Sequence, residues 1–176
     1  MRFIDFLRTT VLACAAAATV LGALAIREVA LEGDTALLVF ALSWWALATV
    51  VGVWLGRERS ILPAISRLLA GARSASTLPE QAKPGRVAAN RLWPLFALLV
   101  VSAGLGWLFP QIPAIAAGFP TMWALYWRRQ ESAVTAIEDR DGVAFYVEQT
   151  APWKPIQLVR TPGYRRIGPP SGEGLR

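Results

Sequence analysis

The sequence predicts an all-α integral membrane protein with four transmembrane helices, and its composition is the first observation behind this prediction. Hydrophobic residues make up 55% of the 176 residues, only 17% are charged, and the mean hydropathy is +0.41. Soluble domains average about 25% charged residues, and disordered chains need low hydrophobicity and high charge. The composition therefore favours a membrane protein over both other classes.

The second observation is that four long runs contain no Asp, Glu, Lys or Arg. A helix needs about 20 apolar residues to cross a hydrocarbon core of about 30 Å, and shorter runs span it when the bilayer thins or flanking side chains snorkel. Because lipid offers no partners to backbone polar groups outside helices and closed barrels, we expect helices. The predicted spans, arranged as two hairpins, cover residues 9–26, 35–55, 92–109 and 112–127.

The third observation is that basic residues alternate along the chain in the order that the positive-inside rule requires. Arg2 and Arg8 precede the first span, whereas the link after it carries one Arg against three acidic residues. The next link carries seven basic residues, the link between the third and fourth spans is uncharged, and Arg128 and Arg129 follow the fourth span. We therefore expect four crossings with both termini in the cytoplasm.

The expected location is a bacterial cytoplasmic (inner) membrane. Arg greatly outnumbers Lys, and Ala is abundant, which is typical of a GC-rich bacterial coding sequence.

Two features of this topology leave alternatives open. A cleaved signal peptide is an alternative for the first span, because Arg2 and Arg8 precede it and Ala23-Leu24-Ala25 imitates a cleavage site. The apolar run is long for such a leader. The third and fourth spans are joined only by Pro110 and Gln111, so they form either a tight pair that crosses twice or a re-entrant segment that dips in and returns.

An amphipathic segment follows the second span. Residues 60–72 place apolar side chains on one helical stripe and basic ones largely elsewhere, with Ser60 as the N-cap. Such a helix lies either on the membrane surface or against the cytoplasmic parts of the protein itself.

The C-terminal part is expected in the cytoplasm, after a transmembrane domain of residues 1–130. Residues 131–166 combine an extension of the fourth helix, which ends at the stop signal Asp141-Gly142, with a short strand module. Two strand-like segments, at 143–150 and 156–160, predict a β-hairpin. Residues 167–176 are rich in Gly and Pro and are expected to be disordered.

Several classes of site are excluded by composition. Histidine is absent and Cys14 is the only cysteine, which excludes a His base, a His-ligated metal, an intrachain disulfide and a thiolate metal cluster. Proton relays and ion-coupled carriers place charged groups in their spans, and these spans carry none. We identify no catalytic, cofactor-binding or metal-binding residues and expect no cofactor. Membrane-flanking arginines account for the net charge of +6, so we expect no nucleic-acid partner.

Three features within the spans concern helix packing. Trp44 and Trp45 point about 100° apart on a helix, so we expect one between helices and the other towards lipid. Pro120 should bend the fourth span, either as a static kink or as a hinge. Small residues four apart favour close packing within the chain, with homo-oligomerisation as an alternative. These pairs are Ala13 and Ala17, Ala18 and Gly22, Ser102 and Gly106, and Ala114 and Gly118.

Two sets of residues are candidate contact sites. Aromatic and Arg residues are the usual anchors of protein interfaces, and they alternate in the C-terminal part. The candidate partner-binding residues are Phe145, Tyr146, Trp153, Tyr164, Arg165 and Arg166. Basic residues beside the spans would attract anionic headgroups, at about 1 kcal/mol each near the surface. The candidate anionic-lipid contacts are Arg57, Arg59, Arg67, Arg73, Arg128 and Arg129.

The favoured function is a non-enzymatic accessory, scaffold or assembly subunit that docks a protein partner through its cytoplasmic tail. One alternative is a small oligomeric transporter or channel in which the kinked fourth span lines a path. The other is a lipid-modifying enzyme at the membrane surface that uses carboxylates such as Glu131 and Glu138.

Overall fold

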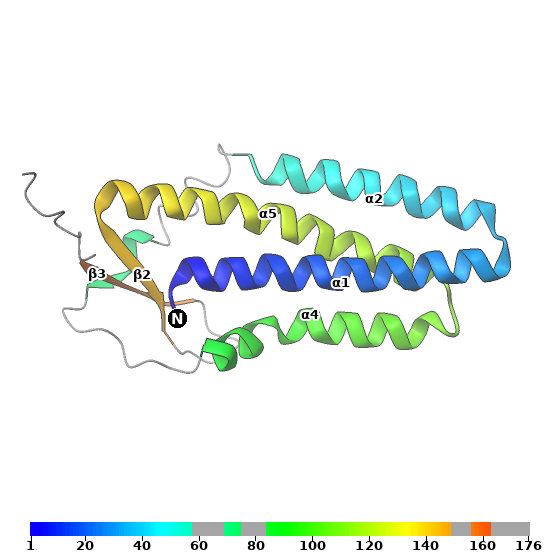
Figure 1. Ribbon diagram of the computed structural model, residues 1–176, viewed down its shortest axis with the longest axis horizontal. Coiled ribbons are helices and arrows are strands. Elements are labelled where there is room, and N and C mark those ends of the chain that lie inside the picture. The colour runs from blue at the N-terminus through cyan, green and yellow to red at the C-terminus, as the bar shows by residue number, and fades with distance from the viewer. Residues whose placement is uncertain (58–68, 75–83, 149–155, 163–176) are drawn as a thin grey trace, which may run out of the picture.

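The computed structural model describes residues 1–57, 69–74, 84–148 and 156–162, and this part of the chain is mainly helical (Figure 1). The helices are α1 (Phe3–Glu32), α2 (Thr35–Leu55), α4 (Pro84–Gly106) and α5 (Gln111–Asp141). The strands are β1 (Arg73–Ser74), β2 (Val143–Val147) and β3 (Leu158–Pro162). Most of the predicted amphipathic helix and the whole predicted disordered tail lie outside the described residues.

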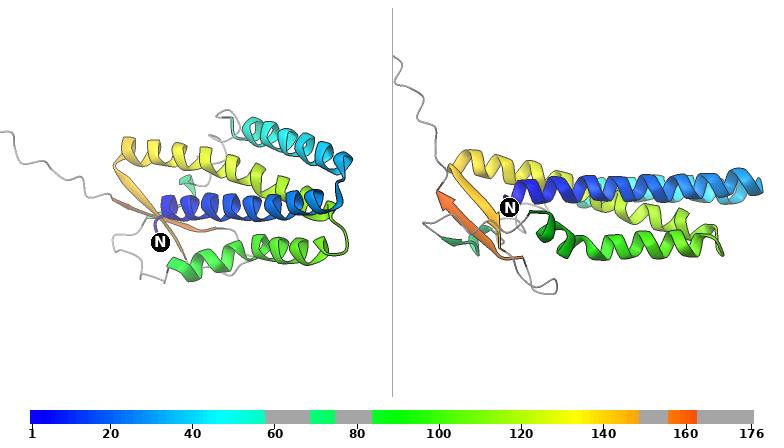
Figure 2. Two further views of the ribbon diagram at one scale, coloured as in Figure 1. Left: turned by 45° about the vertical axis from the view of Figure 1, so that its right-hand side comes forward. Right: turned by 60° about the horizontal axis from the view of Figure 1, so that its bottom comes forward.

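The four helices lie side by side along the long axis of the molecule, and the strands and the N-terminus gather at one end (Figures 1 and 2). α1 and α4 run away from the strands, while α2 and α5 run back towards them. We call the end with the strands the sheet end and the opposite end, where α1 turns into α2 and α4 into α5, the turn end.

Three helices, α1, α2 and α4, are long and apolar enough to cross a membrane. The fourth predicted span falls within α5, which is not among these three. The physical reason is composition: its apolar half, residues 111–127, is rich in Ala, Pro and aromatic residues instead of Leu, Ile and Val. α5 contacts all three other helices, so it can be a bundle helix with fewer strongly apolar side chains.

Small residues let the other helices approach α5. Its buried positions include Ala114, Ala117 and Gly118, while α2 buries Ala41 and Gly52. The most extensive helix contact joins α1 to α5, and α1 has little contact with α2. The structure therefore does not confirm the grouping into two hairpins, but it places small residues in contacts within the chain. α1 is the main contact partner of α5, so α1 is an integral part of this bundle.

The tandem tryptophans of α2 both reach α5, which corrects the expectation that one would turn away to lipid. The indole N–H of Trp44 donates to the carbonyl of Ile115 at 2.8 Å, and that of Trp45 donates to the carbonyl of Ala114 at 2.8 Å. A Cβ on Gly118 would lie 2.3 Å from Nε1 of Trp44, so this glycine makes room for the indole. Side chains as long as Trp can converge on one neighbour although their Cα–Cβ bonds diverge.

Glycines end two of the helices, and the one at Gly142 is the stop that the Asp141-Gly142 signal predicted. Gly33 ends α1 with a φ of 68°, and Gly142 ends α5 with a φ of 60°, a left-handed conformation that favours glycine. Asp34 caps α2 by accepting hydrogen bonds from the amides of Ala36 at 2.9 Å and Leu37 at 3.0 Å.

A small sheet with the strand order β1-β3-β2 closes one end of the bundle. β2 and β3 pair antiparallel, with Phe145 opposite Arg160 and Val147 opposite Leu158, which confirms the predicted strand pair. β1 adds to β3 in parallel. On the outer edge of β2, the amide of Val147 donates to the carbonyl of Met1 at 3.0 Å. The chain start is therefore attached to the C-terminal module.

Large apolar side chains fill the sheet end and join α1, α4, α5 and the sheet in one core. We call this cluster the sheet-end core; its buried members are Phe3, Phe6, Leu7, Leu69, Val87, Val134, Phe145, Val147 and Leu158. Leu69 belongs to the described part of the predicted amphipathic segment, and it packs against the protein itself. The core also explains why α1 begins at Phe3, before the uncharged run that predicted it.

Candidate functional site

The structure describes two of the predicted partner-binding residues, Phe145 and Tyr146, and the first of them is turned inward. Phe145 is only 3% exposed and packs in the sheet-end core, which removes it from the predicted docking surface. Tyr146 is half-buried on the opposite face of β2. Trp153, Tyr164, Arg165 and Arg166 lie outside the described residues. An apolar ring on a strand that covers the end of a bundle is more stable when it is buried against that bundle than when it is left in water. The sequence pattern alone did not distinguish a ring buried in the protein's own core from one exposed for a partner.

Three of the predicted lipid-contacting arginines lie at the sheet end with exposed side chains, namely Arg57, Arg128 and Arg129. Arg128 and Arg129 line a depression of about 300 Å³ together with Val53 of α2. The backbone of Arg73 forms part of β1, whereas Arg59 and Arg67 lie outside the described residues. The described arginines that the prediction named therefore share one end of the bundle.

A buried carboxylate joins the residue before α1 to strand β2. The side chain of Glu138 is 5% exposed; one oxygen accepts from the Arg2 guanidinium at 2.9 Å and the other from the Phe145 amide at 3.0 Å. The three groups come from the residue before α1, the end of α5 and β2. Glu138 thus holds the sheet against the helices, and both of its carboxylate oxygens are engaged in these contacts.

Two other carboxylates, those of Glu131 and Asp139, border a shallow depression of about 520 Å³ on α5 together with Arg128. The two residues are eight apart, which corresponds to a rise of about 12 Å along the helix. No group of three His, Cys, Asp or Glu residues that could hold a metal occurs in the part of the chain that the structure describes.

The surface at the end of α5 carries an exposed ion pair. Arg140 donates to Asp141 at 2.8 Å, and this hydrogen bond lowers the pKa of the Asp141 carboxyl below its ordinary value. Both side chains are solvent-exposed, so the pair contributes little to stability.

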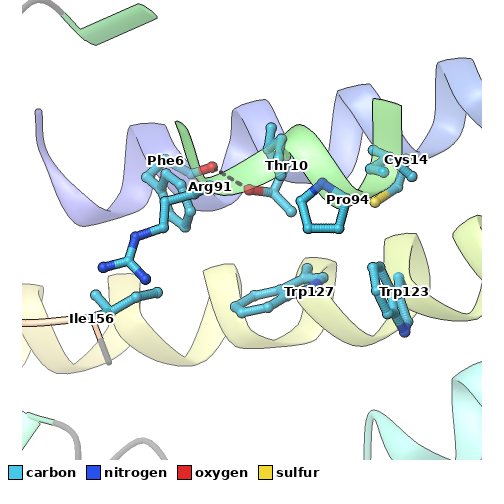
Figure 3. Close-up of a pocket in the computed structure, with 10 residues that line it drawn as sticks. Phe6, Thr10, Cys14, Arg91, Pro94, Trp123, Trp127 and Ile156 are labelled. Carbon is cyan, nitrogen blue, oxygen red and sulfur yellow. Dashed lines mark hydrogen bonds between the residues drawn. The ribbon is translucent and has the colours of Figure 1, made fainter. Parts of the chain in front are cut away.

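A cleft between α1, α4 and α5 is the most distinctive apolar cavity of the described chain, with a volume of about 240 Å³ (Figure 3). α1 contributes Phe6, Thr10 and Cys14, which are four residues apart and so follow one face of the helix. α5 contributes Trp127 and Trp123, also four apart. The cleft therefore runs along the bundle axis.

The two ends of the cleft differ in polarity. At the sheet end, the guanidinium of Arg91 lies beside Ile156, whereas Cys14 and Trp123 lie at the deeper end (Figure 3). The walls from α4 include Pro94, which lies inside the helix and has no amide N–H to donate. Arg91 directly precedes the apolar stretch of α4, so the charged end of the cleft is at the level where membrane-flanking arginines are expected.

The polar groups inside the cleft are few. The Thr10 hydroxyl donates to the Phe6 carbonyl at 2.9 Å, and the walls around it are mainly aromatic and aliphatic. Trp127 is steadied by Tyr126, whose ring lies 5.8 Å away at 72°. Such a site can hold an apolar chain, with one cationic group at its entrance.

Reasoning from the sequence did not identify the residues that form the buried carboxylate contact and the cleft. Arg91 was counted only as one of seven basic residues in a link, and Glu138 only as one of several tail carboxylates. The spacing of Phe6, Thr10 and Cys14 was visible, but nothing in the sequence showed which helices would face that stripe.

Comparison with known proteins gives no guide to function. No family model matches the chain, and neither curated proteins nor solved structures show a significant match.

Proposed function

We propose that this chain crosses a bacterial cytoplasmic membrane four times and acts as a non-enzymatic accessory or assembly subunit, which holds its sheet as a docking module on the cytoplasmic side. The observation that carries the proposal is the sheet-end core. It joins the strands to α1, α4 and α5 through large buried side chains such as Phe3 and Phe145, so the module is fixed to the bundle instead of tethered to it.

The four-span topology is supported by the distribution of apolar and basic side chains. Large apolar residues are exposed on the outside of the bundle, for example Leu12 at 63%, Val50 at 65% and Val100 at 69%. Exposed surfaces of this kind are unusual in soluble monomers and suit contact with lipid. α4 is long and apolar enough to cross a membrane, and α5 runs back beside it to the sheet end, which supports a full crossing instead of a re-entrant loop.

The docking role is supported by the surface of the module. Tyr146 is half-buried on the outer face of the sheet, and Glu148 and Gln157 are exposed on that face. Arg160 pairs with Phe145 and so lies on the opposite face, where its side chain is exposed. Arg and Tyr are frequent interface anchors, and anchors on a rigid support lose less conformational entropy on binding. A membrane-fixed module of this kind suits an assembly subunit.

Neither alternative function gains a specific observation. Pro120 is fully buried, and none of the cavities found among the described residues is lined by it. The lipid-modifying enzyme is expected to use carboxylates such as Glu131 and Glu138, whereas both oxygens of Glu138 are engaged in holding the sheet.

The test is crosslinking and co-purification of the full-length protein from its native membrane in mild detergent. We expect a stoichiometric partner with the wild type that is lost with the double variant Tyr146→Ser, Arg160→Glu. The matched control Arg27→Glu reverses an exposed charge at the turn end and should retain the partner. Equal recovery from all three proteins, or no stoichiometric partner with the wild type, would refute the docking role.

A further inference from the structure

We infer that the cleft between α1, α4 and α5 binds one acyl chain of an anionic phospholipid of the cytoplasmic leaflet, with the headgroup phosphate at Arg91. This inference rests on the membrane placement proposed above, but it does not depend on the docking role of the sheet.

The shape of the cleft selects a slender apolar group. Its volume of about 240 Å³ is below the range of about 300–1,000 Å³ that is common for small-molecule pockets. The stripe from Phe6 to Cys14 spans eight residues, which corresponds to about 12 Å along the bundle axis. A narrow space that runs parallel to the helices in a membrane matches the direction of an acyl chain.

The chemistry of the walls excludes a polar occupant for most of this length. The Thr10 hydroxyl already donates to a backbone carbonyl at 2.9 Å, and the deeper end is bordered by Leu95 and Trp123. A sugar or a free phosphate placed there would lose its hydration without gaining partners. An alkyl chain would lose nothing by entering from the lipid.

The side chain of Trp123 is half exposed, at 49%, so the cleft communicates with the outside of the bundle at the depth of the hydrocarbon. A phospholipid could therefore enter laterally and would not have to pass through the bundle.

The charge at the entrance selects the headgroup. Among the described residues that line the cleft, Arg91 is the only Asp, Glu, Lys or Arg, and it lies at the sheet end. A guanidinium has five N–H donors, so it can contact a phosphate while it keeps other partners. Charge-assisted contacts to phosphate are among the stronger hydrogen bonds. A headgroup with a net negative charge is therefore favoured over a zwitterionic one, which carries its own cationic group beside the phosphate.

The test uses photo-crosslinking in vesicles that contain a trace of phosphatidylglycerol with a diazirine near the end of one acyl chain. After illumination, mass spectrometry maps the labelled peptides of the full-length protein. We expect labelling to concentrate on the peptides around Cys14 and Trp123, and to fall about tenfold in Arg91→Gln, because a hydrogen bond to a charged group contributes enough binding energy for such a change.

Matched controls separate the cleft from general attraction. Arg86→Gln removes an exposed charge from the same helix outside the cleft and should keep the labelling. A phosphatidylcholine probe with the same chains should label these peptides several-fold less. Excess soluble glycerol 3-phosphate should not displace the lipid, because it lacks the chain that fills the cleft.

Three results would overturn the inference. They are even labelling over outward-facing positions such as Val100 and Val101, equal labelling by the two lipid probes, and loss of labelling with glycerol 3-phosphate. If Arg91→Gln does not fold, the comparison of phosphatidylglycerol and phosphatidylcholine probes on the wild type still tests whether the cleft selects an anionic headgroup. Flotation of the protein with the vesicles is scored separately, so failure of membrane insertion is distinguished from failure of lipid binding.

Discussion

At the sheet end, the side chains buried between the helices and the strands are large, such as Phe3, Phe6 and Phe145. Along the rest of the bundle the buried residues of α2 and α5 are mainly small, whereas large apolar residues such as Val100 point outward. Large apolar side chains are therefore buried at the sheet end but exposed along the rest of the bundle. In water, burial of large apolar surface drives packing. In lipid, helices associate mainly through van der Waals packing, and small residues strengthen it because they let the backbones approach closely.

Polar contacts follow the same division. At the sheet end, a buried carboxylate, an arginine and a backbone amide form one connected group around Glu138. In the bundle, the long-range polar contacts between α2 and α5 include the indole N–H bonds of Trp44 and Trp45 to backbone carbonyls. Neither indole bond buries a charge, which would be costly at the depth of the hydrocarbon.

The largest effect is expected from truncating a phenylalanine at the sheet end. Phe145→Ala should destabilise the protein by about 3–5 kcal/mol, since it leaves a cavity in a packed core. The matched change Phe96→Ala, at a side chain 49% exposed on α4, should cost less than about 1 kcal/mol in a lipid environment. Unfolding in mild detergent, followed by circular dichroism, measures both. Equal losses in the free energy of unfolding would mean that large apolar side chains contribute equally to stability in the two regions, which would contradict the comparison.

A smaller loss is expected when the carboxylate that holds the sheet is removed. Glu138→Ala deprives Arg2 and the Phe145 amide of their acceptor and should cost about 1–3 kcal/mol. Glu148→Ala, at an exposed side chain next to the same strand, should have almost no effect. Hydrogen exchange of the β2 amides should rise only in the first variant; unchanged exchange there would show that Glu138 does not hold the sheet.

In the bundle, a Gly→Ala substitution should either lower or raise the free energy of unfolding, depending on which atoms surround the glycine. A Cβ at Gly118 would lie 2.3 Å from Trp44, whereas a Cβ at Gly104 would meet nothing within 4 Å. Gly118→Ala should therefore cost about 1–3 kcal/mol through overpacking, and Gly104→Ala should stabilise by up to about 1 kcal/mol through helix propensity. The same unfolding assay compares them, and a stabilised Gly118→Ala would contradict the close contact between α2 and α5.

Much of the helical part could be predicted from sequence because uncharged runs and turn residues are local signals. The second predicted span has the same bounds as α2, and Gly142 ends α5 where the Asp-Gly signal placed the stop. α1 and α4 begin earlier than their apolar runs, at Phe3 and Pro84. Helices continue past the hydrocarbon when tertiary contacts support them, and hydropathy does not report those contacts.

The candidate sites were less accessible to sequence reasoning because they depend on distant pairs. Glu138 meets a guanidinium that is 136 residues away, and the cleft needs stripes from three helices in one register. Alternation along β2 indicated that Phe145 and Val147 share a face, and the structure confirms it. It did not indicate that this face would pack on the start of α1, so Phe145 was assigned to a partner instead of to the core.

The central claim is that the chain crosses the membrane four times with the sheet in the cytoplasm, and labelling of single cysteines tests it most directly. In a Cys14→Ala background, Gln111→Cys places a thiol at the turn end and Gln157→Cys places one beside the sheet; both native side chains are exposed. With a membrane-impermeant maleimide, we expect the position 111 variant to be labelled in intact spheroplasts and the position 157 variant only after permeabilisation. Labelling at 157 in intact spheroplasts, or at 111 only after permeabilisation, would contradict the account.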